Sequence, residues 1–346
     1  MEHIVLFPFL EYWWVYGVFT LLVLAVLALD LGVFHRQAHE VSFREAAAWS
    51  VVWVMLGLAV GAGLWWYAGH ALAQPERAAA LAALGETSAA AADRIGMEYL
   101  AGYIIEKALA VDNVFVWAMI FTYFAVPKVY QHRILFYGIL GAIVFRALFI
   151  AAGAVLMQYQ WIVWLAGGFL ILTGIKMSLV GDHQLEPEKN PVVRLLRRLL
   201  PITPNLEGQK FLLRRDGVLM ATPLLLVLVL VEVSDIIFAI DSVPAIFAIT
   251  NEPLIVFTSN ICAILGLRAM YFLLASVMDK FHLLKYGLSL ILVFVGLKML
   301  GDIVPGFNQL LDAKGKFPIT WSLGIIGAIL AVSVTLSLML PKKKAP

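Results

Sequence analysis

Long apolar runs, separated by short polar interruptions, dominate this chain of 346 residues. A transmembrane helix needs about 20 mostly apolar residues. Nine such runs occur, at residues 10–30, 47–69, 97–122, 134–157, 161–180, 218–248, 254–278, 284–301 and 320–340. The runs are continuous rather than alternating, which excludes a transmembrane β-barrel. The sequence therefore predicts an all-α polytopic membrane protein with about nine transmembrane helices, forming a single membrane domain over residues 1–346.

The composition agrees with a membrane protein and excludes several other classes. Hydrophobic residues make up 62% of the chain and charged residues only 14%, against about 25% charged in a soluble domain. A net charge of +2 gives no indication of nucleic-acid binding. The single cysteine, Cys262, excludes an internal disulfide framework or a thiolate metal cluster. Motifs for nucleotide hydrolysis, zinc proteolysis and serine hydrolysis do not occur, so we expect neither an enzyme nor a bound cofactor.

The distribution of lysine and arginine predicts the orientation in the membrane. With nine spans, sixteen basic residues fall on one side and four on the other. The amino terminus is therefore expected outside and the carboxyl terminus in the cytoplasm. The loop at 181–217 is predicted to be cytoplasmic and contains the basic run 194–198. Anchoring at lipid headgroups is the simpler interpretation of this run, and docking of a cytoplasmic partner is the alternative.

An internal repeat relates the third to fifth spans to the sixth to eighth. In both copies an acidic residue is followed six positions later by aspartate and then by a small polar residue. An arginine, and a lysine 30 positions after it, follow in both; the matched pairs are Glu106 and Asp235, Asp112 and Asp241, Asn113 and Ser242, Arg146 and Arg268, and Lys176 and Lys298. Because each copy has three spans, residues 97–180 and 218–302 are expected to form an inverted 3+3 repeat. Residues 320–340 form the final span. The ligand site of such proteins lies where the copies meet.

Charged residues inside the predicted spans are candidates for function. Each carboxylate at the centre of a membrane costs roughly 2.5–3.5 kcal/mol on insertion scales. Five acids occupy such positions, namely Glu106, Asp112, Glu232, Asp235 and Asp241. Ion pairing with Lys107, Arg146 or Arg268 is the structural alternative to an ion path. We expect the arginines to hold part of the acid cluster and two or three carboxylates to serve a mobile ion.

Helical spacing predicts which of these groups share a face. Residues seven positions apart lie together, so Glu106 is aligned with Asn113 and Asp235 with Ser242. The second aspartate of each segment, Asp112 or Asp241, then lies to the side. A distorted turn near Ala110 and Ala239 would bring both acids of each segment together, and Pro244 favours one in the sixth span.

Oxygen donors of this kind suit hard divalent cations, meaning Mg²⁺, Ca²⁺ or Mn²⁺. The candidate ligands are Glu106, Asp112, Asn113, Asp235, Asp241 and Ser242. Because no nucleotide-binding motif is present, uphill transport would have to use an ion gradient, and protons are the simplest counter-ion. In the second span, Gly57 and Gly61 form a GxxxG pattern, a weak indication of close helix packing.

The two acidic segments, EKALAVDNVFVW at 106–117 and EVSDIIFAIDSVPAIF at 232–247, resemble the signature stretches of the TerC family of bacterial membrane proteins. The likeness continues through TSN at 258–260 and LGLRAMYFLLA at 265–275, covers about residues 10–340, and is greatest to the Alx branch of manganese exporters. The resemblance implies a protein of the bacterial inner membrane that exports Mn²⁺ as its substrate. It also implies that Glu106, Asp112, Asp235 and Asp241 act as ligands or relay groups.

Two other readings stay open. One is a membrane scaffold that recruits a cytoplasmic metal-stress or tellurite-resistance complex through residues 181–217. The other is a transporter of another hard cation such as Ca²⁺.

Overall fold

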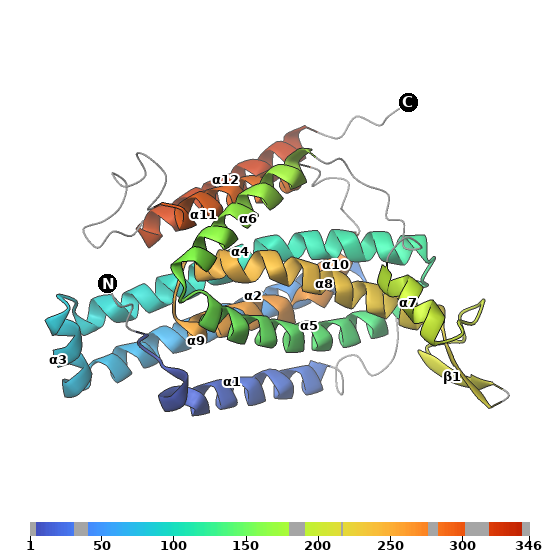
Figure 1. Cartoon of the computed structure of the whole chain (residues 1–346), viewed down its shortest axis with the longest axis horizontal. Helices are drawn as coiled ribbons and strands as arrows, with labels where there is room; N and C mark the ends of the chain where they lie inside the picture. Colours follow the sequence, from blue (N-terminus) through green and yellow to red (C-terminus); the bar gives the residue numbers. More distant parts are fainter. Residues whose placement is uncertain are drawn as a thin grey trace.

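The computed structural model describes residues 5–30, 41–179, 191–215, 217–275, 283–301 and 318–340, and these residues are almost entirely helical (Figure 1). The helices in chain order are α1 (Phe9–Leu29), α2 (Phe43–Leu72), α3 (Pro75–Ala83), α4 (Ser88–Tyr123), α5 (Lys128–Leu156), α6 (Gln160–Leu179), α7 (Pro191–Leu199), α8 (Pro223–Phe247), α9 (Pro253–Leu265), α10 (Leu267–Ala275), α11 (Leu284–Met299) and α12 (Ile319–Met339). Strands β1 (Leu212–Arg215) and β2 (Val218–Ala221) form an antiparallel hairpin, with Leu212 opposite Ala221.

Six of the described helices, α1, α2, α5, α6, α8 and α12, are long and apolar enough to cross a membrane. Helices α9 and α10 meet at a 43° bend and together would make a seventh span. The predicted spans 97–122 and 284–301 coincide with α4 and α11, which do not meet this requirement of length and apolar composition. Helix α11 has only 16 residues, and α4 carries charged residues at its centre. An all-α polytopic membrane fold is thus confirmed, whereas the count of nine spans and the inverted repeat stay predictions.

Local signals set where several helices begin. The Oγ of Ser42 accepts a hydrogen bond from the amide of Glu45 at the start of α2, and Thr87 caps α4 in the same way. Helices α8 and α9 each begin with a proline, which lacks the N–H that a first helical turn leaves unpaired. The distorted turns that would bring both acids of each segment together do not occur near Ala110 and Ala239, because α4 and α8 are continuous helices there and α8 also passes through Pro244.

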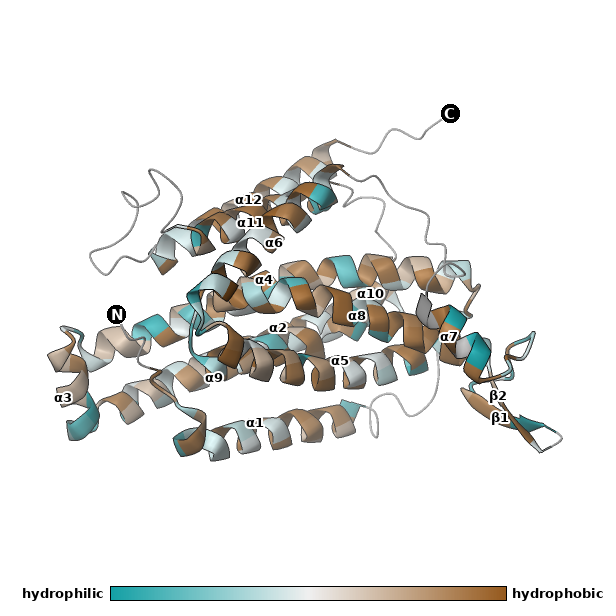
Figure 2. Cartoon of the chain, viewed as in Figure 1, coloured by the Kyte–Doolittle hydropathy of each residue, from teal (hydrophilic) through white to brown (hydrophobic). Residues whose placement is uncertain are grey.

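Helix α4 lies at the centre of the bundle and contacts α2, α8, α9 and α10. Helix α5 packs against α8 and α9, while α6, α11 and α12 form a group along one side of the bundle (Figure 1). Many large apolar side chains of these helices are exposed, and hydrophobic residues predominate along the ribbons (Figure 2). Such a surface suits lipid tails, since a soluble protein rarely exposes a contiguous apolar patch of this kind.

The GxxxG pattern of α2 marks close packing against α4, as its sequence indicated. A β-carbon at Gly57 would lie 2.7 Å from the ring of Tyr103, and one at Gly61 would overlap the ring of Tyr99. The Tyr99 hydroxyl also donates a hydrogen bond of 2.7 Å to the carbonyl oxygen of Gly57. The two glycines therefore let two tyrosines of α4 lie directly on the backbone of α2.

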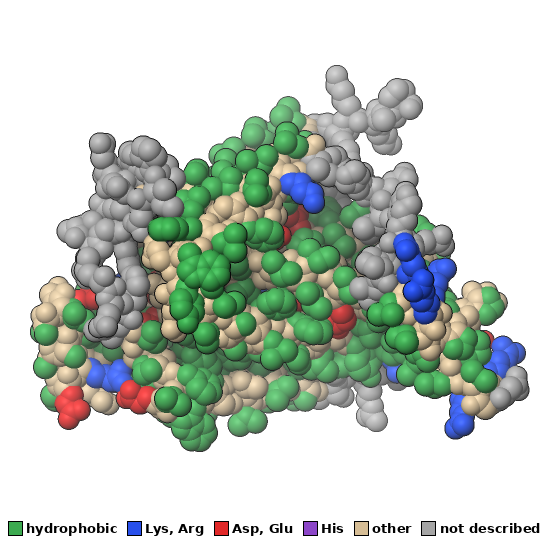
Figure 3. Space-filling view, viewed as in Figure 1, with side chains coloured by type: hydrophobic (Ala, Val, Ile, Leu, Met, Phe, Trp, Pro, Cys, Tyr) green, Lys and Arg blue, Asp and Glu red, His purple; other side chains and the backbone are tan. Residues whose placement is uncertain are grey.

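The two ends of the bundle differ in charge. Arginine side chains gather over α7 and the β1–β2 hairpin, at the right of Figure 3. At the opposite end, near α3, acidic and basic side chains are mixed (Figure 3). The basic end is the part of the predicted loop 181–217 that the structure describes.

Candidate functional site

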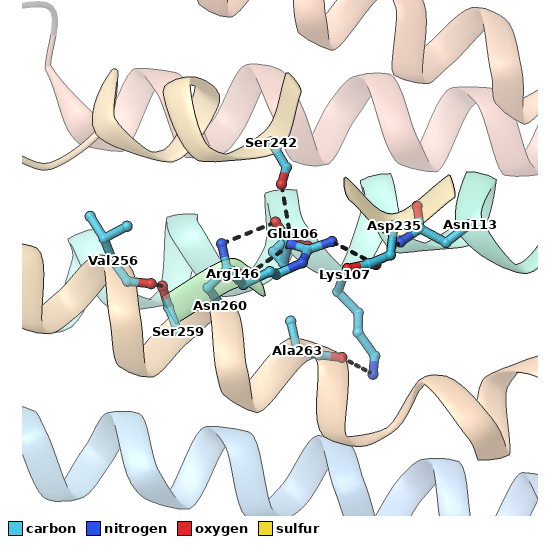
Figure 4. A network of polar contacts seen from close by, with 10 residues as sticks. All are labelled: Glu106, Lys107, Asn113, Arg146, Asp235, Ser242, Val256, Ser259, Asn260 and Ala263. Carbon is cyan, nitrogen blue, oxygen red and sulfur yellow. Dashed lines mark hydrogen bonds and ion pairs between the residues drawn. The ribbon is translucent and has the colours of Figure 1, made fainter. Parts of the chain in front are cut away.

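A buried arginine joins the two acidic segments at the centre of the bundle (Figure 4). Nη1 of Arg146, on α5, donates to Oε1 of Glu106 on α4 and pairs with it as an ion. The same nitrogen donates to Oγ of Ser242 at 3.1 Å and to Oδ1 of Asn260 on α9 at 2.8 Å. Nη2 of Arg146 lies 3.5 Å from Oδ1 of Asp235 on α8. Three helices, α4, α8 and α9, therefore place polar groups around one guanidinium of α5.

Amide groups connect the same residues to each other. Nδ2 of Asn113 donates to Oδ1 of Asp235 at 3.1 Å, and Nδ2 of Asn260 lies 3.4 Å from Oε2 of Glu106. We call this set the Arg146 network; its members are Glu106, Asn113, Arg146, Asp235, Ser242 and Asn260. All six side chains are at most 2% exposed.

The faces predicted from helical spacing are the ones that meet. Glu106 and Asn113 share one face of α4, and Asp235 and Ser242 share one face of α8. Regular helices are enough to bring them together, so the distorted turns are not needed. Each acidic segment supplies an acid and, seven positions later, an amide or a hydroxyl. The site is therefore built from equivalent positions of the two predicted repeats.

The charges in the network do not balance. With both acids ionised, Glu106 and Asp235 carry two negative charges and Arg146 one positive charge. One carboxylate oxygen, Oδ2 of Asp235, and one donor, Nε of Arg146, are buried with no hydrogen-bond partner among the described residues. A buried polar group without a partner costs about 1–3 kcal/mol. With both acids ionised, the network lacks one positive charge.

The structure places the remaining two predicted ligands elsewhere. Oδ1 of Asp241 accepts a hydrogen bond of 3.4 Å from Thr173 on α6, and Lys176 acts on this carboxylate electrostatically. Among the described residues, Lys285 of α11 acts electrostatically on Asp112. In the described part of the chain, no group of three or more histidine, cysteine or acidic side chains is arranged to hold a metal ion. The carboxylates that do converge are Glu106 and Asp235, supplemented by amide and hydroxyl oxygens.

The two repeat-equivalent arginines have different partners. Arg146 holds the acids of the network as expected, whereas Arg268 pairs with Asp30 at the end of α1. The expectation that both arginines hold the acid cluster is therefore wrong for Arg268. Asp30 closes the first predicted span, and its sequence position gave no reason to connect it with α10.

Two further charged residues lie close to the network. Nζ of Lys107 donates a hydrogen bond of 3.0 Å to the carbonyl oxygen of Ala263, so this cation points away from Glu106 (Figure 4). The Glu232 carboxylate lies against Gly141 of α5, where any β-carbon would overlap it. Oε2 of Glu232 has no hydrogen-bond partner among the described residues although it is buried.

Asn260 is the network member that spacing arguments missed. It comes from α9, outside both acidic segments, and contacts Glu106 as well as Arg146. The sequence held one signal for it, since the polar stretch Thr258-Ser259-Asn260 interrupts an apolar span. In the structure all three side chains are completely buried.

Comparison with known proteins agrees with this architecture. The family sequence model described as "Integral membrane protein TerC family" matches residues 91–345, which include every member of the Arg146 network. The chain belongs to the TerC family. No solved structure is similar to it.

Named relatives cover nearly the whole chain. A protein of Photorhabdus laumondii called "Putative membrane-bound redox modulator Alx" is 48% identical over 332 residues, 95% of this chain and 96% of its own. The protein of the same name from Escherichia coli K12 is 48% identical and covers 92% of each chain. An uncharacterized membrane protein of Myxococcus xanthus is 47% identical over 93% of this chain and 91% of its own.

Proposed function

We propose that this TerC family protein is a secondary transporter that exports a divalent metal ion, Mn²⁺, from the cytoplasm. The observation that carries the proposal is the convergence of Glu106 and Asp235, two fully buried carboxylates from α4 and α8. Buried acids among membrane helices are costly, and they mark ion pathways unless pairing neutralises them. Here a single arginine faces both, so pairing within the described residues leaves a negative charge for a cation.

The donor atoms support a hard cation. Carboxylate, hydroxyl and amide oxygens suit Mg²⁺, Ca²⁺ and Mn²⁺, and the network offers these oxygens without nitrogen or sulfur ligands. Mn²⁺ is selected among them by the resemblance to manganese exporters, and Ca²⁺ is the alternative substrate. Asp112 and Asp241, on the sides of the same helices, are proposed as relay groups along the path.

The repeat and the topology belong to the same proposal. Helix α4 packs against α9 while its counterpart α8 packs against α5, and α6 packs against its counterpart α11. This reciprocal pattern supports an inverted 3+3 repeat, with α4 and α11 completing nine spans. The basic end at α7 and the hairpin supports a cytoplasmic location for that end in the bacterial inner membrane, with the amino terminus outside.

Export against a gradient needs an energy source. We propose inward proton flow as that source, with protons as counter-ions that replace the metal on the carboxylates. This coupling predicts that metal binding releases protons and that collapse of the proton gradient slows export.

A scaffold role is the second candidate, and the described part of residues 181–217 favours it. Helix α7 exposes Arg194, Arg197 and Arg198, and the hairpin exposes Leu212 and Val218. Such a mixed basic and apolar surface suits an acidic partner or lipid headgroups. The relatives' name suggests redox modulation, but the chain's one cysteine, Cys262, is buried and leaves no pair for an internal disulfide.

Metal uptake into liposomes that hold the purified protein tests the proposal. We expect Mn²⁺ movement with wild type, and a loss of at least tenfold with Glu106→Gln or Asp235→Asn. Glu76→Gln, which neutralises an exposed acid of α3, is the matched control and should keep the wild-type rate. If wild type moves no metal, or if replacing Arg197 and Arg198 abolishes function while Glu106→Gln does not, the scaffold is the better description.

A further inference from the structure

We propose that Arg146 is a built-in counter-cation that occupies the metal position in the empty site and leaves it when metal binds. This inference rests on the proposed function. It assigns to Arg146 a competitive role, in place of the purely structural role that a buried ion pair otherwise has.

The first argument is the geometry around the guanidinium. Its two terminal nitrogens face four oxygen atoms: Oε1 of Glu106, Oγ of Ser242, Oδ1 of Asn260 and Oδ1 of Asp235 (Figure 4). Arginine has only donors, so each of these oxygens directs a lone pair at it. Two carboxylates, one hydroxyl and one amide carbonyl are also the donor types that a hard divalent cation prefers. The arginine therefore holds a ready set of metal ligands.

The second argument is exclusion. A lone pair that accepts from Nη1 of Arg146 cannot bind a metal ion at the same time. Because Nη1 alone contacts Glu106, Ser242 and Asn260, a metal that takes these oxygens must move this nitrogen away. All the residues concerned are at most 2% exposed, so water gives little screening of the repulsion between the guanidinium and the metal.

The third argument is charge. With both acids ionised and Arg146 in place, the site keeps one net negative charge, and with a divalent ion in place of Arg146 the two acids are compensated. The chain as a whole still gains two charges on binding, because Arg146 remains part of it. An empty carrier that keeps its arginine at the site returns through the membrane with a smaller uncompensated charge there.

The repeat supplies an internal comparison. Arg268 occupies the equivalent position in the second copy but pairs with Asp30 of α1, away from the network. Arginines at this repeat position are therefore found both inside the acid cluster and withdrawn from it. Arg268 therefore illustrates an arginine that is paired outside the acid cluster, and its substitution gives a matched control for that of Arg146.

The experiment measures Mn²⁺ affinity of the purified full chain in detergent, from the free Mn²⁺ signal in electron paramagnetic resonance. Arg146→Gln should bind Mn²⁺ about tenfold more tightly than wild type, equivalent to about 1.4 kcal/mol. Turnover in liposomes should fall, because the ion then leaves the site more slowly. Arg268→Gln removes an equivalent buried arginine outside the network and should change the affinity by less than about twofold.

Arg146→Lys keeps the positive charge, and this variant is measured as well in case Arg146→Gln does not fold. Lysine makes fewer directed hydrogen bonds than a guanidinium, so its affinity should lie between wild type and Arg146→Gln. Unchanged or weaker binding in every folded Arg146 variant would overturn the inference and show that the arginine only positions the oxygens. If wild type itself binds no Mn²⁺, or Glu106→Gln leaves binding intact, the proposed function fails instead.

Discussion

Asn113 of α4 donates a hydrogen bond of 3.1 Å to the carboxylate of Asp235 of α8. The two residues belong to the two acidic segments and lie 122 positions apart in the chain. Their contact fixes α4 against α8 where each helix carries its buried acid.

Asn113→Asp tests how much the site depends on this amide. The change replaces a hydrogen-bond donor with a third anion next to Asp235, in a medium that strengthens repulsion. We expect a lower melting temperature without metal and a larger rise on addition of Mn²⁺ than wild type shows. Gln158→Glu, an added acid at an exposed position of the turn between α5 and α6, is the control. An equal rise in melting temperature in Asn113→Asp and wild type would show that Asn113 does not belong to the metal site.

Glu106→Gln tests the ion pair with Arg146. Removing one partner of a buried pair leaves a charge with less compensation and costs about 3 kcal/mol or more. Asp235 still faces the arginine at 3.5 Å, so we expect the lower end of that range. Unfolding by denaturant in detergent gives the free energy, and Glu76→Gln on the surface should leave it unchanged. Wild-type stability of Glu106→Gln would contradict a strong buried pair.

Asp112→Asn and Asp241→Asn test the relay assignment. Asp241 accepts a hydrogen bond from Thr173, Lys285 acts electrostatically on Asp112, and neither aspartate is among the described contacts of the Arg146 network. We therefore expect transport to fall while Mn²⁺ affinity changes by less than about threefold. A cell that depends on the protein should lose manganese tolerance with either variant. A large loss of affinity would instead make the two aspartates direct ligands.

Helical periodicity alone predicted much of the centre of the site. Glu106 with Asn113, and Asp235 with Ser242, follow from seven-residue spacing on regular helices. In the structure Glu106, Asp235 and Ser242 lie at one arginine, and Asn113 binds Asp235. The repeat alignment predicted which arginines matter but not their partners. The pair between Arg268 and Asp30 joins residues 238 positions apart, and no local pattern encodes a contact of that kind.

The errors concern features that local rules overstate. Pro244 predicted a distorted turn, yet α8 continues through it; neighbouring helices can supply partners for the backbone group that a proline leaves unpaired. Asn260 was missed because a single amide inside an apolar span has no periodic signature. Its role appears only when α9 packs between α4 and α5.

Gly296→Ala tests the contact between α6 and α11, the two closing helices of the proposed repeats. A β-carbon at Gly296 would lie 2.6 Å from the carbonyl oxygen of Gly167, a backbone atom that has little room to shift. Overpacking of this kind costs about 1–3 kcal/mol, and we expect a lower melting temperature in detergent. Gly168→Ala, one position along α6 and with nothing near its β-carbon, should leave the melting temperature unchanged or slightly raised. Equal melting temperatures for the two variants would rule out a tight α6–α11 contact.

Glu252 links the start of the chain to the end of the bundle that is proposed to face outward. Its carboxylate accepts hydrogen bonds from the backbone amides of Leu6 at 2.6 Å and Phe7 at 3.2 Å, and Arg77 binds the carbonyl oxygen of Leu6. Burial raises the pKa of Glu252 to about 7; the two backbone hydrogen bonds act in the opposite direction, and nearby Glu98 adds to the rise. The group lies just before α9, outside the membrane-spanning segments.

The raised pKa predicts a pH-dependent stability that Glu252→Gln removes. Between the ordinary pKa of about 4.5 and the folded-state pKa of about 7, the folded protein binds this proton more tightly than the unfolded chain does. The free energy of unfolding therefore falls as pH rises through that window and levels off above it. We expect wild type to lose more stability than Glu252→Gln between pH 5 and pH 8, in melting curves of both proteins in the same detergent. Comparison of the two proteins cancels the titration of all other groups. Parallel curves would show that Glu252 keeps its ordinary pKa, and that the amides of Leu6 and Phe7 hold an ionised carboxylate throughout.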